Sequence, residues 1–432
     1  MKKILALLLA VLMVASLAAC GGKDDKKTNS GNKVTLADGT EVEIDIPGTT
    51  DGEPVKMTLK VWGPTEDIGE GKWLTQRLDA FKEANKDKYD ITWDVGVCSE
   101  GDAQTNVTKD PEAAAHVYMF ASDQLGGLIS AGALTQLGGK SLDQVKNDNP
   151  AWAVNTVTYT DGNIYGYPVC TNTWFMYYNK SLISAEDAKS LEAMLAKTQV
   201  AFDWGNGWYN GAFFFGAGGT LFGENGLDAE AGVDYKGEVG VAVAQRMLQL
   251  FNAGLINGGN GADMAQFLEG NVGAFFSGSW NYEALKKELG DNLGVAVLPT
   301  FTVGEDTYTM KSFAGTKCAG VNAHIENPIE AKAANELAAF LASEESQKLH
   351  FDLRSISPTH KGLAETDKVK SHPVCSIELA VMNTCSIMQP GIPAMGKYWS
   401  PMGTFGGNIP TGSMTEADVG DFLQQTLDQM NG

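Results

Sequence analysis

Residues 161–180 read DGNIYGYPVCTNTWFMYYNK, and the rest of the chain is organised around this stretch. After an Asp-Gly turn signal it carries no charge until its last residue. Residues 164–169 predict one strand and residues 174–178 a second, aromatic one, with the small and polar residues 170–173 between them. Pro168 has no backbone donor, so we do not expect one continuous central strand. We interpret the stretch as a crossing from one lobe of the protein to another.

The length and charge of the chain limit its class. It has 432 residues, which is too long for a single core and predicts two or three domains. Its apolar fraction of 43% is ordinary for a globular protein, whereas its net charge of -21 is strongly acidic. Such a surface disfavours nucleic acid, anionic lipid and polyanionic ligands. It is compatible with neutral or cationic ligands, and also with acidity that serves only solubility.

The first residues carry a targeting signal. Two lysines precede an apolar run over 4–17 that is too short to span a bilayer comfortably. The sequence LAACG at 17–21 resembles the lipobox of bacterial lipoproteins, in which the signal is cut before the cysteine and the thiol is acylated. We expect a signal peptide at 1–19, a lipidated Cys20 and a flexible tether over 20–54, which would anchor the protein on the extracytoplasmic face of the membrane. A plain secretory signal with an incidental cysteine is the alternative.

Five further cysteines are widely spaced: Cys98, Cys170, Cys318, Cys375 and Cys385. An odd number spread over a large chain does not predict a disulfide framework. Pairing between Cys375 and Cys385 stays open, and we expect small buried hydrophobic residues as the default.

Strand and helix patterns alternate after residue 55. This alternation predicts a mostly parallel sheet covered by helices on both faces, with ligands at the carboxyl ends of strands. The expected strands are 57–61, 91–95, 113–120, 272–276, 293–298 and 313–321, after a weak hairpin pattern over 34–46. The expected helices are 73–81, 125–134, 184–197, 239–253, 264–269, 281–289, 328–342 and 415–430. Residues 202–219 mix aromatic residues with glycines and fit neither pattern.

Five segments, in order along the chain, carry a resemblance to a known family. They are VYMFASDQLGGLISAGAL within 113–137, GNIYGYPVCTNTWFMYYNKSLI at 162–183, GNVGAFFSGSWNYEALKKELGDNLGVAVLPTF at 270–301, SFAGTKCAGVNAHIENPIEAKAANELAAFLAS at 312–343 and IMQPGIPAMGKYWSPM at 387–402. They are similar to segments of the maltose/maltodextrin-binding proteins of bacterial ABC importers. The chain thus resembles the bacterial extracellular solute-binding protein family 1 over most of residues 55–432.

This resemblance implies a fold and a division into domains. The fold would be an α/β, two-lobe periplasmic-binding-protein-like fold (type II), in which each lobe is a mostly parallel sheet flanked by helices and the ligand lies in the interlobe cleft. The N-terminal lobe would comprise 55–169 with 313–353, and the C-terminal lobe 173–300 with 360–432. The chain would cross between lobes near 169–173, 299–313 and 353–359.

Aromatic side chains are the first candidates for a sugar site, because the C–H face of a neutral sugar lies well on an aromatic ring. Trp280, Trp399 and Trp208 match positions at which the resembled family stacks aromatic rings on sugar, and Tyr398 lies beside Trp399. Phe120 occupies a position where the family often has a tryptophan. A place in the hydrophobic core is the alternative for each of these residues.

Polar side chains at strand ends are the second set of candidates, because sugar hydroxyls need both donors and acceptors. Asp123 matches a family carboxylate that bonds sugar hydroxyls, and Glu66 falls where the family has an acidic residue. Asn172, Gln124 and Asn206 stand where the family often has Glu, Arg and a second Glu. Amides donate and accept hydrogen bonds, so sugar binding is compatible with these changes, although the preferred linkage is put in doubt.

These residues together predict a substrate-binding lipoprotein of an ABC transporter for α-glucan oligosaccharides of the maltose/maltodextrin type. Its partners would be the oligosaccharide, a permease, an ATPase and the membrane through Cys20; it would be a monomer without cofactor, metal or nucleic acid. Another neutral oligosaccharide, or a polyamine held by cation–π contacts, is the alternative ligand. A surface glycoside hydrolase using Asp123 and Glu66 is the alternative function.

Apart from the glycoside hydrolase alternative, the common enzyme motifs that we considered are absent from the sequence. Gly139-Lys140-Ser141 ends like a P-loop, but Leu134 stands where its first glycine should be. The chain has no H-E-x-x-H or G-x-S-x-G motif. His360 and His372 lie near Cys375 in the sequence without the spacing of a zinc site. We therefore expect a binding protein and not an enzyme.

Overall fold

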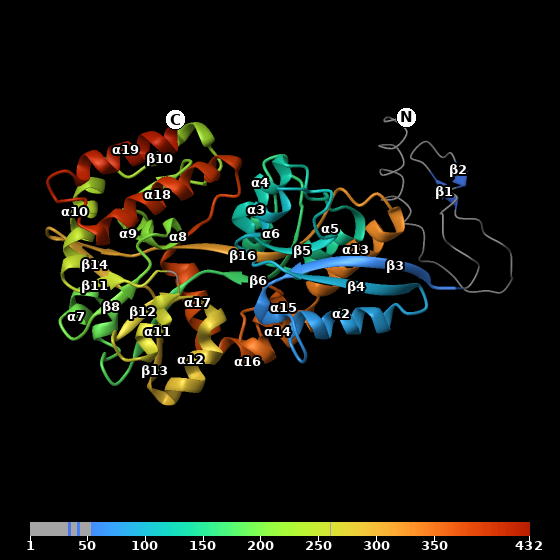
Figure 1. Ribbon diagram of the computed structural model, residues 1–432, viewed down its shortest axis with the longest axis horizontal. Helices are drawn as coiled ribbons and strands as arrows, with labels where there is room; N and C mark the ends of the chain where they lie inside the picture. Colours follow the sequence, from blue (N-terminus) through green and yellow to red (C-terminus); the bar gives the residue numbers. More distant parts are fainter. Residues whose placement is uncertain (1–32, 36–40, 44–52, 260) are drawn as a thin grey trace. The chain divides into compact units, whose positions relative to one another are not determined.

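The computed structural model describes residues 33–35, 41–43, 53–259 and 261–432. The chain divides into two compact α/β units (Figure 1). Unit 1 comprises Met1–Gln124, Leu128–Val169 and Lys317–Gln347, and unit 2 comprises Leu125–Gly127, Cys170–Thr316 and Lys348–Gly432. The chain passes between the units after Gln124 and Gly127, where the sequence analysis expects no crossing. It passes between them again after Val169, in the stretch that opens the sequence analysis, and then after Thr316 and Gln347.

Unit 1 is built on a sheet whose middle strand is β3 (Val55–Gly63). β3 pairs in parallel with β4 (Tyr89–Val97) and β5 (Val117–Ala121), and residues 317–321 of β16 (Ser312–Val321) pair antiparallel with β5. Alternate residues of β3 point into the core, as the period-two pattern of the sequence predicts. Because β3 and β5 run in the same direction, the segments that follow them, Thr65–Asp67 and Ser122–Gln124, begin at the same edge of the sheet.

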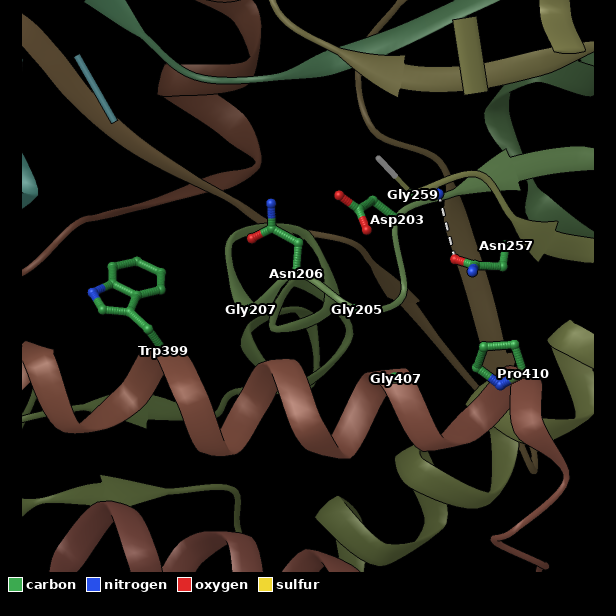
Figure 2. Close-up of a pocket in the computed structure, with 9 residues that line it drawn as sticks. All are labelled: Asp203, Gly205, Asn206, Gly207, Asn257, Gly259, Trp399, Gly407 and Pro410. Carbon is green, nitrogen blue, oxygen red and sulfur yellow. Dashed lines mark hydrogen bonds between the residues drawn. The ribbon is translucent and has the colours of Figure 1, made fainter. Parts of the chain in front are cut away.

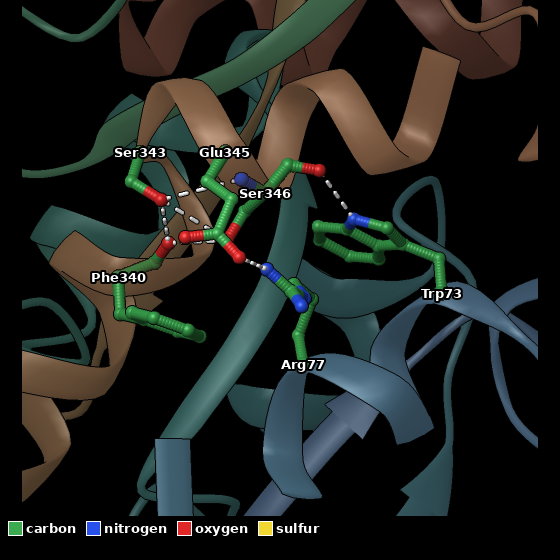
Figure 3. Close-up of polar contacts among 6 residues, drawn as sticks. All are labelled: Trp73, Arg77, Phe340, Ser343, Glu345 and Ser346. Carbon is green, nitrogen blue, oxygen red and sulfur yellow. Dashed lines mark hydrogen bonds and ion pairs between the residues drawn. The ribbon is translucent and has the colours of Figure 1, made fainter. Parts of the chain in front are cut away.

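Helix α2 (Trp73–Ala84) packs on unit 1 with the apolar face that the sequence predicts. Trp73 Nε1 donates to the carbonyl of Ser346 at 2.7 Å, and Arg77 pairs with the exposed Glu345 at 3.1 Å (Figure 3). The Ser346 hydroxyl in turn donates to the carbonyl of Phe340 at 2.6 Å. These contacts fix α2 against the junction of α13 (Pro328–Leu341) and α14 (Glu344–Arg354).

The remaining elements that begin in unit 1 or in the preceding segment are short. They are β1 (Lys33–Thr35), β2 (Glu41–Glu43), η2 (Thr65–Asp67), α3 (Ala103–Val107), η3 (Ser122–Gln124), α5 (Gly139–Asp148), α6 (Ala151–Thr156) and β6 (Tyr167–Asn172). α4 (Leu125–Ser130) spans a division between the units. β1 and β2 pair antiparallel, as the hairpin pattern predicts.

Unit 2 contains a sheet with the strand order β11-β8-β12-β7-β13. β8 (Val200–Phe202) pairs in parallel with β11 (Leu255–Asn257) and β12 (Ala274–Ser277). β7 (Phe175–Asn179) runs antiparallel to β12 and to β13 (Leu293–Ala296), so the other four strands point in one direction. The carboxyl ends of β8, β11 and β12 therefore meet at one edge of this sheet.

Helices surround the sheet of unit 2. They are α7 (Leu191–Leu195), α8 (Gly207–Asn210), α9 (Ala212–Gly216), α10 (Glu238–Asn252), α11 (Ala262–Leu268), α12 (Tyr282–Leu289), α15 (Lys361–Ala364), α16 (Asp367–Lys370), α17 (Pro373–Thr384), α18 (Gly396–Asn408) and α19 (Val419–Asn431). Short strands and 3-10 turns join them: η4 (Asp187–Lys189), β9 (Thr220–Leu221), β10 (Val233–Asp234), η6 (Ser279–Asn281), β14 (Thr300–Val303), β15 (Asp306–Thr309), β17 (Ser386–Met388) and η8 (Pro393–Met395).

Several element boundaries differ from the sequence prediction by a few residues, as where β5 begins at Val117, α4 ends at Ser130 and α19 begins at Val419. Two larger differences have identifiable reasons. The expected strand at 164–169 is wrong at both ends, because Ile164 makes only an isolated bridge to Thr158 and β6 runs from Tyr167 through Asn172. The expected helix at 184–197 is wrong over most of its length, because only the 3-10 turn η4 (Asp187–Lys189) and the short α7 (Leu191–Leu195) form there. Ser190 between them is extended, and its side chain accepts from the Ala193 amide to cap α7.

The cysteines follow the default expectation. All five that the structure describes are buried and lie outside any disulfide, including Cys375 and Cys385. Cys375 packs with Phe351, Leu363 and Val369, whereas Cys385 belongs to the large apolar core of unit 2. In the described part of the chain, no helix combines the length and the apolar character that crossing a membrane requires.

Candidate ligand-binding site

The carboxyl edge of the unit 2 sheet gathers polar and aromatic side chains. Asp203 follows β8 directly, Asn257 is the last residue of β11, and Trp280 follows β12 across two small residues. In the ladder Asn257 pairs with Phe202, so Asp203 and Asn257 leave adjacent strands at the same level. Ligands of α/β sheets bind at this edge.

A pocket of about 420 Å³ opens here, within unit 2 (Figure 2). Its lining consists of Asp203, Gly205, Asn206, Gly207, Asn257, Gly259, Trp399, Gly407 and Pro410. Four of these residues are glycines, which leave space above the backbone, and three offer a carboxyl or carboxamide group. Two predicted site residues, Asn206 and Trp399, thus lie in one pocket. The volume is in the range of about 300–1,000 Å³ that is usual for small-molecule sites.

Asn206 holds the polar wall of the pocket in place. Its side chain caps α8 by accepting from the backbone N–H of Trp208 at 3.0 Å. α8 is fixed against α18, because the Tyr398 hydroxyl donates to the carbonyl of Gly207 at 2.9 Å. Tyr398 is fully buried, so the structure places this predicted site residue beneath the pocket, with its ring 5.0 Å from that of Trp399.

Trp208 and Trp280 form an aromatic pair beside Asn206. Their ring centroids lie 6.1 Å apart with an interplanar angle of 31°, and both side chains are half-buried. The indole N–H of Trp208 donates to Gln389 Oε1 at 3.1 Å, which fixes the orientation of this ring. A Cβ at Gly278 would lie 1.9 Å from the Trp280 ring, so this ring packs directly on the glycine. The pair is therefore held rigidly while part of each ring stays open to solvent.

Burial disfavours the charged form of the acidic groups near this edge. Burial raises the pKa of Asp203, and a hydrogen bond from the Asn206 side chain lowers this pKa by a smaller amount. Burial also raises the pKa of Asp263, and the nearby charge of Asp203 raises it further. Among the described residues, no group of three or more His, Cys, Asp or Glu side chains is placed to hold a metal ion.

The predicted site residues of unit 1 fall into different environments. Asp123 is half-buried in η3, and burial raises its pKa to about 7. Gln124 uses both ends of its amide locally: its oxygen accepts from the Gln104 amide at 2.7 Å, and its nitrogen donates to the carbonyl of Gly101. Glu66 is exposed.

Phe120 and Asn172 are enclosed by protein. Phe120 is completely buried in β5, where its ring lies against the backbone of Gly166 and Gly320. Asn172 is buried at the end of β6 in unit 2. Their contact with a ligand stays a prediction, as it does for Asp123, Gln124 and Glu66.

Several residues of this edge were not predicted. Asp203, Asn257, Gly259, Gly407 and Pro410 line the pocket, and Gln389 orients Trp208. The glycine-rich aromatic segment 202–219 was a partial signal, since it contains Asp203 and the loop to α8. β8 and β11 have only three residues each, which is too few to show a strand pattern in the sequence.

Comparison with known proteins identifies the class. A family model described as bacterial extracellular solute-binding protein matches residues 76–375, and the chain belongs to this family, with two α/β units as its two lobes. It is 27% identical to a galactooligosaccharide-binding protein of Bacillus subtilis (strain 168), over 100% of this chain and 97% of that protein. It is 25% identical to a maltooligosaccharide ABC transporter solute-binding lipoprotein of Streptococcus pneumoniae serotype 4 (strain ATCC BAA-334 / TIGR4), over 93% and 90%.

A solved structure determined with acarbose is also similar. It is 41% identical to this chain, with a TM-score of 0.83, and the match covers 87% of this chain and 99% of the other. The family and these relatives are binding proteins, in line with the expectation drawn from the five matching segments.

Proposed function

We propose that this protein captures neutral oligosaccharides of the maltodextrin type as the substrate-binding lipoprotein of an ABC transporter. The observation that carries the proposal is the rigid, partly open pair Trp208–Trp280 next to a polar pocket at the carboxyl edge of the unit 2 sheet. The pair offers apolar faces for pyranose rings. Asn206, Asp203 and Asn257 offer donors and acceptors for hydroxyls.

The charge of the pocket supports a neutral ligand. Its polar lining is made of two carboxamides and one carboxyl group, whose charged form burial disfavours. The solved relative with acarbose and the maltooligosaccharide-binding relative support an α-glucan. The galactooligosaccharide-binding relative, which aligns over the whole chain, favours a second candidate, a neutral oligosaccharide of another linkage.

The transporter setting rests on the sequence and on the named relatives. Cys20 and the signal peptide lie outside the described residues, and the similarity to the pneumococcal ABC transporter solute-binding lipoprotein supports an anchor at this cysteine. We place the protein on the extracytoplasmic face of the membrane as a monomer. Its partners are a permease and an ATPase.

Titration calorimetry of the full chain tests the ligand. We expect heat of binding with maltotriose and none with spermidine. Heat only with a galactooligosaccharide would keep the oligosaccharide function and replace the α-glucan. Heat only with spermidine would contradict the proposal, because the aromatic pair would then serve cation–π contacts.

The acidity of Asp123 predicts a pH dependence of binding. Its pKa is about 7 in the free protein, so the ionised fraction rises from about a tenth at pH 6 to about nine tenths at pH 8. A sugar hydroxyl donates more strongly to a carboxylate than to a protonated acid. We therefore expect the maltotriose affinity of the wild type to rise, by up to about tenfold, between these pH values.

Asp123→Asn is the control for this dependence, because it has nearly the same shape and does not titrate. Its affinity should be the same at pH 6 and pH 8 in calorimetric titrations. An equal pH slope in Asp123→Asn and wild type would assign the dependence to another group and contradict the role of Asp123.

A further inference from the structure

Six Asn-Gly pairs occur in the chain. Glycine has no Cβ to shield its backbone nitrogen, so this nitrogen can attack the side-chain carboxamide of a preceding asparagine unless the structure prevents it. One pair includes residue 260, which lies outside the described residues. The other five begin at Asn206, Asn210, Asn225, Asn257 and Asn431.

In two of these pairs a hydrogen bond engages the attacking nitrogen. The N–H of Gly258 donates to the Phe202 carbonyl at 3.0 Å, and the N–H of Gly432 donates to the Asp428 carbonyl at 2.9 Å. The peptide group of each glycine has to leave its partner before it can turn toward the asparagine side chain. Such a local opening costs free energy and slows the reaction.

Two further pairs are held by burial and packing. Asn210 is fully buried, and its carboxamide nitrogen donates to two carbonyls at 2.9 and 2.8 Å. Gly207, which follows Asn206, is buried, and its carbonyl accepts from the Tyr398 hydroxyl at 2.9 Å. A Cβ at Gly207 would lie 3.0 Å from that of Met402, so this peptide has little room to rotate.

Asn225 differs from these four because it lies in an exposed turn between β9 and β10. Its Oδ1 accepts from the Leu227 N–H at 3.1 Å, which bends the carboxamide back over the Gly226 peptide. The same N–H stabilises the negative charge that develops on this oxygen during attack at the carboxamide carbon. Among the described residues, no hydrogen bond engages the N–H of Gly226.

We propose that Asn225 is a modification site at which the protein deamidates spontaneously. The nitrogen of Gly226 attacks Cγ of Asn225 and closes a five-membered succinimide, while the side-chain nitrogen leaves as ammonia and takes up the proton of the Gly226 amide. Water then opens the imide at either carbonyl and yields aspartate or isoaspartate at position 225. Because water is the only co-reactant, the conversion needs no enzyme.

The product differs from the parent chain in charge and in main-chain length. Residue 225 gains a negative charge in a turn that already contains Glu224 and Asp228. Isoaspartate also adds one methylene to the main chain directly before Gly226, where a Cβ would lie 3.1 Å from Pro390 Cγ. The turn therefore shifts relative to Pro390 as the protein ages.

Peptide mapping by mass spectrometry, after incubation of the full chain in mildly alkaline buffer, tests this assignment. We expect Asn225 to deamidate about tenfold or more faster than the other four described pairs, because those react only after a local opening. Asn225→Gln is the matched control, since it keeps an exposed carboxamide but has to close a less favourable six-membered ring. This variant should lack the earliest acidic species that anion-exchange chromatography separates from the wild type.

Incubation in urea shows whether the fold causes the selectivity. In the unfolded chain all five pairs lose their tertiary contacts and should react at similar rates. The same preference for Asn225 in urea as in the folded protein would assign it to the local sequence and overturn the role of the fold. Folded protein in which position 225 stays unmodified, or in which the five pairs react equally fast, would overturn the proposal itself.

Discussion

Trp280→Ala is expected to lower the affinity for maltotriose by about a hundredfold, corresponding to roughly 2–4 kcal/mol of binding free energy. The Trp280 ring packs on Gly278 and lies 6.1 Å from the ring of Trp208, so its position is fixed before a ligand arrives. A preorganised ring loses little conformational entropy when a sugar stacks on it. Its removal deletes one ring of the pair, while Trp208 keeps its contact with the ring of Tyr209 at 5.3 Å.

Calorimetry of two further variants separates stacking from structure. Trp280→Phe keeps an aromatic face at the same position and should lose less affinity than Trp280→Ala. Trp152→Ala removes a half-buried tryptophan from α6 in unit 1 and should leave maltotriose binding unchanged. An unaltered affinity in a folded Trp280→Ala protein would show that the pair is not the sugar platform.

Local patterns were sufficient for the long elements of the fold. The apolar spacing of residues 239–253 predicts a helix, and α10 covers Glu238–Asn252 with Val243 and Met247 in the core. The pattern over residues 328–342 likewise matches α13. In such helices every turn repeats the same burial, so the sequence carries the signal many times.

Unlike the long helices, the candidate site depends on contacts between segments that are distant in the sequence. Asp203 and Asn257 are 54 positions apart and meet because β8 and β11 pair in parallel, which no local pattern encodes. The family resemblance indicated Trp280 and Trp399 but could not separate an open ring from a buried one. Tyr398, next to Trp399, is fully buried, and its hydroxyl donates to the Gly207 carbonyl.

The contact between α18 and the loop after β8 leads to a second large effect, on stability. A Cβ added at Gly406 would lie 2.0 Å from the carbonyl oxygen of Trp204 and 2.3 Å from Asn210 Nδ2. Asn210 is fully buried and donates to the carbonyls of Trp204 and Met402 at 2.9 and 2.8 Å, so neither group can move without breaking these hydrogen bonds. We expect Gly406→Ala to destabilise unit 2 by about 3 kcal/mol.

Thermal unfolding followed by circular dichroism measures this effect, with Gly407→Ala as the control one residue further along the helix. Gly406→Ala should lower the melting temperature by about 5–10 °C. Gly407→Ala adds the same methyl group where it meets only the Cα of Gly205 at 3.9 Å, so its melting temperature should be equal to that of the wild type or slightly higher. Equal melting temperatures for the two variants would mean that α18 can move away from Trp204 at little cost. The positions of Trp399 and Gly407 over the pocket would then not be fixed by this contact, because both residues depend on α18 for their placement.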